Sequence, residues 1–154
     1  MDSIDYRLLD VLQTDGKTSY STLGQAVGLS ISAVNERLKK LQSAGVLRGY
    51  AALVDPETIG LGVCGFVQIL ITDPAREEGL LRTIEDFPEV QECHCITGDF
   101  SYLLKVRATS PRAFEDFLRG KIKTIAGVVR THSLIVLTTY KETPALPLPS
   151  AAGE

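Results

Sequence analysis

Tryptophan is absent from the 154-residue sequence, and methionine, histidine and cysteine are rare, at one, two and three residues. An odd number of cysteines in a chain of ordinary size argues against a disulfide framework. The longest mostly apolar run, Val63–Ile71, is too short to span a membrane. The acidic N-terminus MDSID lacks the apolar segment of an export signal. We therefore expect a cytoplasmic, globular protein with no membrane partner.

The chain also lacks the strong positive charge that is common in nucleic-acid-binding proteins, because its formal net charge is −3. The charge is unevenly distributed: residues 1–50 hold six basic and five acidic residues, and the remainder holds ten and fourteen. Between Asn35 and Arg48, four basic residues accompany the single acid Glu36. Since each phosphate contact adds its own counterion-release term, we expect this small basic patch to bind DNA well only in several copies.

Three helices are predicted within residues 1–50, the first running to about Gln13. Ser3, Ser19 and Ser30 stand where helix caps are favoured, and Gly28 can adopt the left-handed conformation that ends the second helix. The third helix carries an apolar stripe made of Ile31, Val34, Leu38 and Leu41. A helix pair joined by a short glycine-containing turn is typical of a helix-turn-helix, whose second helix enters the major groove. Two ordinary packed helices with a solvated face are the alternative.

The rest of the chain predicts an α+β domain. Residues 51–62 are interpreted as a linker strand, and residues 63–141 as strands and helices in the order β-α-β-β-α-β, a ferredoxin-like unit. The expected strands are 63–71, 90–97, 102–108 and 128–140, and helices begin at Pro74 and Pro111. The proline-rich tail, residues 142–154, is expected to be disordered.

The first and third of these strands place apolar residues on both faces, whereas a ferredoxin-like sheet carries its helices on one face only. A large open apolar face is an interaction surface, and a second copy of the chain is its simplest cover. The residues therefore predict a homodimer.

Several motifs in these segments resemble the Lrp/AsnC transcription regulators. IDYRLLDVLQTDGKTSYSTLGQAVGLSISAVNERLKKLQSAGVLRGYAALVDPETIG resembles the N-terminal half of that family, and VQECHCITGDFSYLL and AGVVRTHSLIVL resemble the C-terminal half. The resemblance runs from about Ile4 to Lys141. It implies a winged-helix-like DNA-binding domain and a ferredoxin-like domain that pairs sheet to sheet, assembles as an octamer of four dimers and binds an amino-acid effector.

Double-stranded DNA is thus the expected partner of the third helix. Ser32, Asn35 and Glu36 are candidates for base edges, because Asn suits adenine and Glu accepts from cytosine. Phosphates are the expected partners of Arg37, Lys39 and Lys40. Thr18, Ser19 and Ser30 stand at helix starts, where backbone amides can hold a phosphate. Solvated surface residues and helix caps are the alternative for each position.

The resemblance further implies an effector site between dimers, lined by Gly98, Asp99, Phe100, Ser101, Thr131 and Ser133. Asp99 could accept the ammonium of an amino acid, and loop amides with Thr131 or Ser133 could donate to its carboxylate. Ser101 stands where the family often has a second Asp. An ordinary hairpin turn, with Asp99 bonded to its own backbone, is the alternative. No cofactor is expected.

No metal site is expected at Cys93-His94-Cys95, because alternation along a strand turns His94 away from the two cysteines, which we expect to be buried. Two other functions are the alternatives to a regulator. A sirohaem-decarboxylase-like enzyme would need the convergence of His94, His132, Arg107 and Arg130. A nucleoid-associated DNA-packing protein would bind promoter and random DNA alike. The helix-turn-helix pattern favours a regulator over an enzyme.

Overall fold

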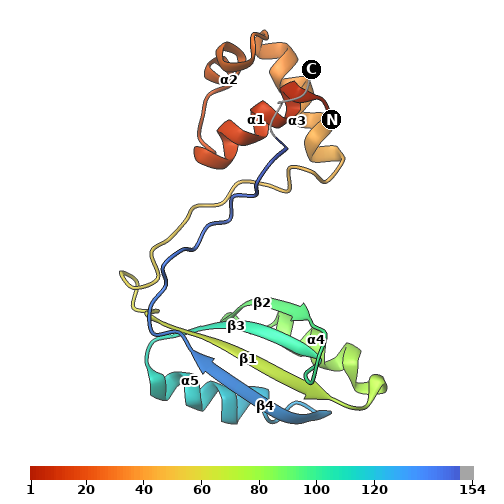
Figure 1. The fold of residues 1–154 in the computed structure, drawn as a ribbon, viewed down its shortest axis with the longest axis vertical. Helices are drawn as coiled ribbons and strands as arrows, with labels where there is room; N and C mark the ends of the chain where they lie inside the picture. The colour runs from red at the N-terminus through yellow and green to blue at the C-terminus, as the bar shows by residue number, and fades with distance from the viewer. Residues whose placement is uncertain (150–154) are drawn as a thin grey trace. The chain divides into compact units, whose positions relative to one another are not determined.

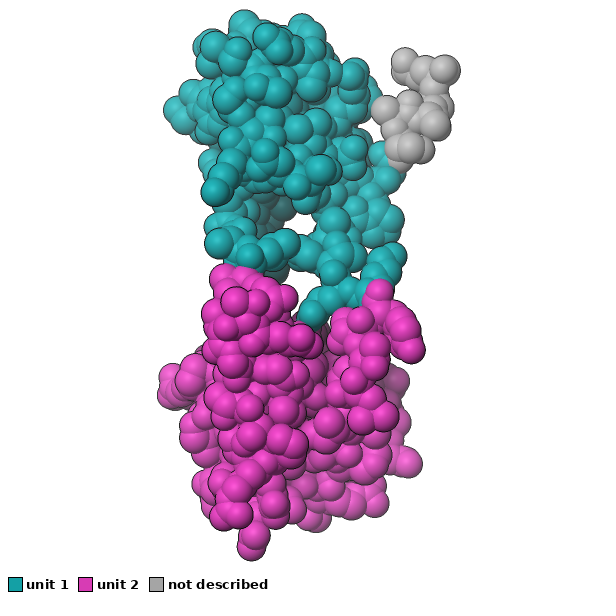
Figure 2. All heavy atoms as spheres, turned by 90° about the vertical axis from the view of Figure 1, so that its left-hand side faces the viewer, with its two compact units in different colours: residues 1–53, 141–154 teal, residues 54–140 magenta. Residues whose placement is uncertain are grey.

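The computed structural model describes residues 1–149 and divides into two compact units (Figures 1 and 2). The helical unit contains Met1–Leu53 together with the described chain from Lys141 onward, and the sheet unit contains Val54–Tyr140. The chain therefore passes between the units twice.

Three helices build the helical unit: α1 (Ser3–Thr14), α2 (Tyr20–Val27) and α3 (Ile31–Ser43). The predicted caps of α2 and α3 are confirmed, because the Ser19 and Ser30 hydroxyls accept from backbone amides three residues on, and Gly28 has a φ of 73°. The predicted cap of α1 is wrong by one residue. Asp2, not Ser3, accepts from the Asp5 amide, since a carboxylate is favoured at the positive end of the helix dipole.

The core of the helical unit comes from all three helices and includes the fully buried Leu8, Leu23, Val34 and Leu38. Ile31 is a correction to the predicted stripe, because its side chain is 56% exposed. It lies at the first position of α3, three residues before the first buried member of the stripe, Val34.

The two segments outside the regular elements also differ from expectation. Residues 51–62 form a turn at 56–60 and no strand, so the predicted linker strand is wrong for this single chain. Residues 142–149 have no helix or strand either. Nevertheless Leu148 packs against the helical core, so this part of the tail is attached rather than disordered. Residues 150–154 of the predicted tail lie outside the described residues.

The sheet unit has the predicted β-α-β-β-α-β order. Its antiparallel strands are β1 (Val63–Ile71), β2 (Val90–Cys95), β3 (Tyr102–Ala108) and β4 (Val128–Ile135), arranged β2-β3-β1-β4. Its helical segments are η1 (Pro74–Arg76), α4 (Glu77–Glu85), α5 (Pro111–Phe117) and the π-helical η2 (Leu118–Ile122). Strand β2 ends two residues before the predicted bound, and β4 ends five residues before it.

Both helices pack on one face of the sheet, as Figure 1 shows. Leu80 and Ile84 of α4 join Phe114 of α5 and the inward residues of β1 and β3 in one core. Gly65 allows α5 to approach closely, because a Cβ there would lie 2.6 Å from the Phe114 ring. No helix covers the opposite face among the residues that the structure describes. We call this opposite face the open face.

The cysteines follow the predicted alternation but not the predicted burial. Cys93 and Cys95 pair with Leu104 and Tyr102, whereas His94 pairs with Leu103 and so points to the other face. Cys64 is buried, but Cys93 and Cys95 are exposed. The reason is that β2 is an edge strand. The order of strands in the sheet cannot be predicted from the local sequence.

Candidate nucleic-acid interface and effector site

Helix α3 presents a polar surface that begins at its N-terminus. Ser32, Glu36, Lys39 and Lys40 are exposed and Asn35 is half-buried. Because successive helical side chains three or four residues apart share a face, Ser32, Glu36 and Lys40 follow one line along α3. This line joins two residues that can read base edges to a cation that can hold a phosphate.

Arg37, the remaining predicted contact on α3, is paired with carboxylates of the same unit. Its guanidinium donates to Asp2 at 2.7 Å and to Asp5 at 2.8 Å, so it ties α3 to the start of α1. The Asp5 backbone amide, and then Arg37, lower the pKa of Asp2, and the two carboxylates raise the pKa of Arg37. These bonds give Arg37 a structural role, and a phosphate contact by the same side chain stays a prediction. The partners lie more than 30 positions away in sequence, so no local pattern could reveal them.

The residues at the start of α2 make mainly local contacts. The Thr18 hydroxyl donates to Asp15 at 2.8 Å, and the Ser19 hydroxyl accepts from the Thr22 amide at 3.1 Å. These bonds fix the helix start and satisfy one of its end amides, leaving others for a phosphate. Ser30 acts in the same way at α3, where it accepts from the Ala33 amide at 3.2 Å.

Ile31 is a candidate contact that the sequence analysis did not include. It follows the Ser30 cap directly and exposes its side chain beside Ser32. An apolar side chain at the start of a recognition helix can contact the methyl group of thymine. Its place in the first turn of the helix indicates such a contact, but the apolar spacing of the helix assigns Ile31 to the buried stripe instead.

The predicted effector loop lies between β2 and β3 and reaches across the open face. The Phe100 ring stacks on His132 with centroids 6.1 Å apart, and the Arg130 guanidinium carbon lies 4.6 Å from the Phe100 centroid. His132 in turn pairs with Gln68 at 2.9 Å. Asp99 next to this cluster is exposed. The structure thus places an arginine over an aromatic ring, and the exposed Asp99 precedes that aromatic residue in the sequence.

The side chain of Ser101 is engaged in hydrogen bonds within the sheet. Its hydroxyl donates to the Ile71 carbonyl and accepts from the Ile71 amide, both at 3.2 Å, and its own amide donates to Ile69. These bonds attach the start of β3 to the end of β1. The effector role of Ser101 stays a prediction, since its hydroxyl already bonds to both backbone groups of Ile71.

Thr131 and Ser133 lie on the opposite face of the sheet from Phe100. They pair with Ile69 and Val67, whose side chains belong to the core beneath the helices. One chain therefore does not bring all the predicted effector residues together. Because side chains alternate along a strand, Thr131 and Ser133 point to one face of the sheet and His132, which lies between them, points to the other.

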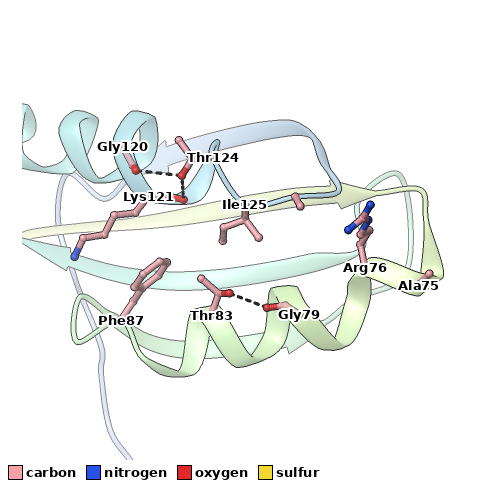
Figure 3. Close-up of a pocket in the computed structure, with 10 residues that line it drawn as sticks. Ala75, Arg76, Gly79, Thr83, Phe87, Gly120, Lys121, Thr124 and Ile125 are labelled. Atoms are coloured by element: carbon pink, nitrogen blue, oxygen red, sulfur yellow. Dashed lines mark hydrogen bonds between the residues drawn. The ribbon is translucent and has the colours of Figure 1, made fainter.

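Among the grooves on the surface of the described sheet unit, two lie near the elements discussed above. The larger, about 590 Å³, lies between α4 and η2 and is lined by residues that include Arg76, Thr83, Phe87 and Lys121 (Figure 3). None of the predicted effector residues lines it. The smaller, about 330 Å³, is formed by Lys123 and Val128–Thr131, so it contains the predicted Thr131 together with Arg130.

The four residues required by the decarboxylase alternative do not converge. His94 lies on β2 and His132 on β4, the two edge strands. Strands β3 and β1 stand between them, which places the edge strands roughly 14 Å apart at ordinary strand spacing. Arg107 on β3 donates to Gln91, and Arg130 lies over Phe100.

A capped recognition helix joined to a ferredoxin-like unit defines a DNA-binding regulator with a separate sensory domain. Two family models match the chain: the AsnC-type helix-turn-helix domain over residues 1–42 and the Lrp/AsnC ligand binding domain over residues 64–146. The chain belongs to the Lrp/AsnC family of transcriptional regulators, and it is a regulator rather than an enzyme.

Similar proteins span nearly the whole chain. The regulator LrpA of Mycobacterium tuberculosis is 41% identical over 91% of this chain and 92% of its own length. The leucine-responsive regulatory protein of Escherichia coli is 33% identical over 95% and 90%. A Neisseria meningitidis regulator in complex with L-methionine has a TM-score of 0.91 at 35% identity, covering 96% of each chain. A feast or famine regulatory protein of M. tuberculosis complexed with L-methionine has a TM-score of 0.88 at 39% identity, covering 96% and 99%.

The helices of the described residues are too short or too polar to cross a bilayer.

Proposed function

We propose that the chain binds operator DNA through α3 as a homodimer or an assembly of dimers, and that an amino acid bound by the sheet unit changes its DNA affinity. The observation that carries this proposal is the exposed polar surface of α3, which begins at a capped helix start and ends in Lys39 and Lys40. An effector acts by binding one assembly or DNA-bound geometry more tightly than another. The cytoplasm is the compartment that fits this role.

The side chains of α3 divide into two groups by chemistry. Ser32 and Asn35 carry donors and acceptors for base edges, and Glu36 can accept from cytosine. Ile31 adds an apolar contact for thymine. Lys39 and Lys40 fix the register on the phosphate backbone, with no sequence preference of their own.

Self-association is supported by the open face of the sheet. Phe66 and Leu134 pair across β1 and β4, and their side chains point away from the helices. Both are incompletely covered in the single chain, as is Leu103 on β3. A second copy would bury them and would double the small basic surface, and four dimers in a ring would multiply it further.

The effector site in this proposal uses Asp99 for the ammonium group and Arg130 for the carboxylate. Charge-assisted contacts of this kind are the strong ones, and arginine suits a carboxylate in two-bond geometry. Phe100 would contact the apolar side chain of the ligand. Since Thr131 and Ser133 face the other way, the site is incomplete within one chain, which fits a position between dimers. The L-methionine complexes of two relatives support an amino acid as the ligand.

A thermal-shift screen of the twenty amino acids tests the effector. A ligand that binds only the folded state raises the melting temperature, and we expect Asp99→Ala to abolish that rise while DNA binding stays intact. Asp116→Ala is the matched control, because Asp116 is an exposed carboxylate on α5. If Asp99→Ala responds as the wild type does, the ligand binds elsewhere.

Sequence preference is tested by comparing the affinity for the chain's own upstream region with that for random duplex at one salt concentration. We expect a clear preference for the upstream region. Equal affinities would favour the DNA-packing alternative and contradict sequence-specific regulation.

A further inference from the structure

The C-terminal residues of the described chain return to the helical unit. After β4 ends at Ile135, the side chains of Leu137 and Tyr140 are 95% and 96% exposed. From Lys141 onward the chain belongs to the helical unit, although it left that unit after Leu53. The helical unit is thus connected to the sheet unit by two covalent segments, one before residue 54 and one after residue 140.

Gln13, near the end of α1, binds this returning segment through both ends of its side-chain amide. Its Oε1 accepts from the Leu146 amide at 2.7 Å, and its Nε2 donates to the Leu146 carbonyl at 3.2 Å. One side chain therefore satisfies both backbone groups of a residue, as a neighbouring strand would. Leu148 packs against the core of the three helices, whereas the side chain of Leu146 is 69% exposed.

The composition of the segment favours docking of this kind. Pro144, Pro147 and Pro149 fix their φ angles, so little conformational freedom is lost when the segment docks. Prolines also remove backbone donors, and the Ala145 amide is already bonded to the Thr143 hydroxyl at 3.1 Å. The Leu146 amide is then a remaining donor for Gln13.

We propose that residues 143–149 are an intramolecular ligand of the helix-turn-helix unit, and we call them the C-terminal clasp. The clasp docks at the end of α1, where Gln13 makes the polar contact and Leu148 packs against the core of the three helices. Docking completes the core of the helical unit and holds that unit by a second connection. Two connections restrict the orientations that the unit can adopt, which lowers the ordering cost when several copies bind one duplex.

The clasp is tested by hydrogen exchange of the α1 and α3 amides, which reports the stability of the helical unit alone. We expect Leu148→Asp to speed exchange about tenfold, because an anchor side chain is lost from the core. Gln13→Ala should also speed exchange, because two hydrogen bonds to Leu146 are lost. Leu137→Asp is the matched control: it places the same charge in the same returning segment, at a side chain that contacts almost nothing.

A chain that ends at Tyr140 removes the clasp entirely. We expect fast exchange in α1 and several-fold weaker DNA binding with an unchanged salt slope, because no phosphate contact is lost. A synthetic peptide of residues 141–149, added to this shortened chain, should restore slow exchange. Wild-type exchange rates in both the shortened chain and Leu148→Asp would overturn the proposal. Protection that falls on dilution would overturn the assignment of the clasp to its own chain, because a second copy would then supply it.

Discussion

Replacing Lys39 and Lys40 together by alanine tests whether the second half of α3 holds the phosphate backbone. Both lysines are exposed, unlike Arg37, which is bonded to two carboxylates. Each lost phosphate contact reduces the slope of log K against log salt by about 0.9, so two contacts per chain give about 1.8 and a dimer about 3.6. A fourfold rise in salt should then weaken wild-type binding about 150-fold more than it weakens binding of the variant.

The assay is fluorescence anisotropy of a labelled operator duplex at several salt concentrations, with a random duplex in parallel. The variant should lose affinity for both duplexes, because phosphate contacts carry no sequence information. The control is Arg112→Ala with Arg119→Ala, which makes the same change in net charge on exposed residues of α5 and η2. An unchanged slope in the Lys39 and Lys40 variant, or an equal change in the control, would refute the phosphate role.

Further changes separate stability from DNA contact. Arg37→Gln should lower the melting temperature of the helical unit while leaving the salt slope as it is; a shallower slope would support its phosphate role. Because the pKa of Asp2 is lowered in the folded state, its stabilisation is complete above the ordinary carboxyl value of 3.8 and is lost as the pH falls below it. Melting curves of Asp2→Asn should lack that acidic decline, and an identical decline would contradict its origin. Gly65→Ala places a Cβ 2.6 Å from the Phe114 ring and should destabilise the sheet unit by about 1–3 kcal/mol. Gly79→Ala meets nothing within 4 Å and should stabilise it by about 0.5–1 kcal/mol in calorimetry. The reverse order of these two variants would contradict the packing of α5 on β1.

Features that depend on residues close together in the sequence are the ones that the sequence predicts correctly. The caps at Ser19 and Ser30 and the glycine turn between them depend on residues within four positions, and the structure has them as predicted. The order of strands and helices in the sheet unit also follows from apolar runs between turn residues. Errors occur at ends, as at β4, where an apolar run continues past Ile135 although no strand is formed.

The contacts within the candidate sites could not be predicted from the sequence, because each involves a partner distant along the chain. The pattern of α3 makes Arg37 one basic residue among several, and only the packing of α1 reveals its carboxylate partners. The effector loop does meet β4, through Phe100 with His132 and Arg130. Within one chain, however, strand register places Thr131 on the other face of the sheet from Phe100.

The sequence by itself determined the architecture of this protein: a capped helix pair with a local excess of positive charge, followed by a βαββαβ pattern. The resemblance of its motifs to the Lrp/AsnC regulators added the DNA-binding and effector-binding roles. Spacing and capping are short-range physics, so they can be read along the chain. Only the tertiary structure decided which basic residues of α3 remain exposed, that the open face carries Phe100 with Arg130, and that Gln13 holds the returning C-terminal segment. The physical reason is that these contacts are made between residues up to 133 positions apart, where packing rather than local preference selects the partner.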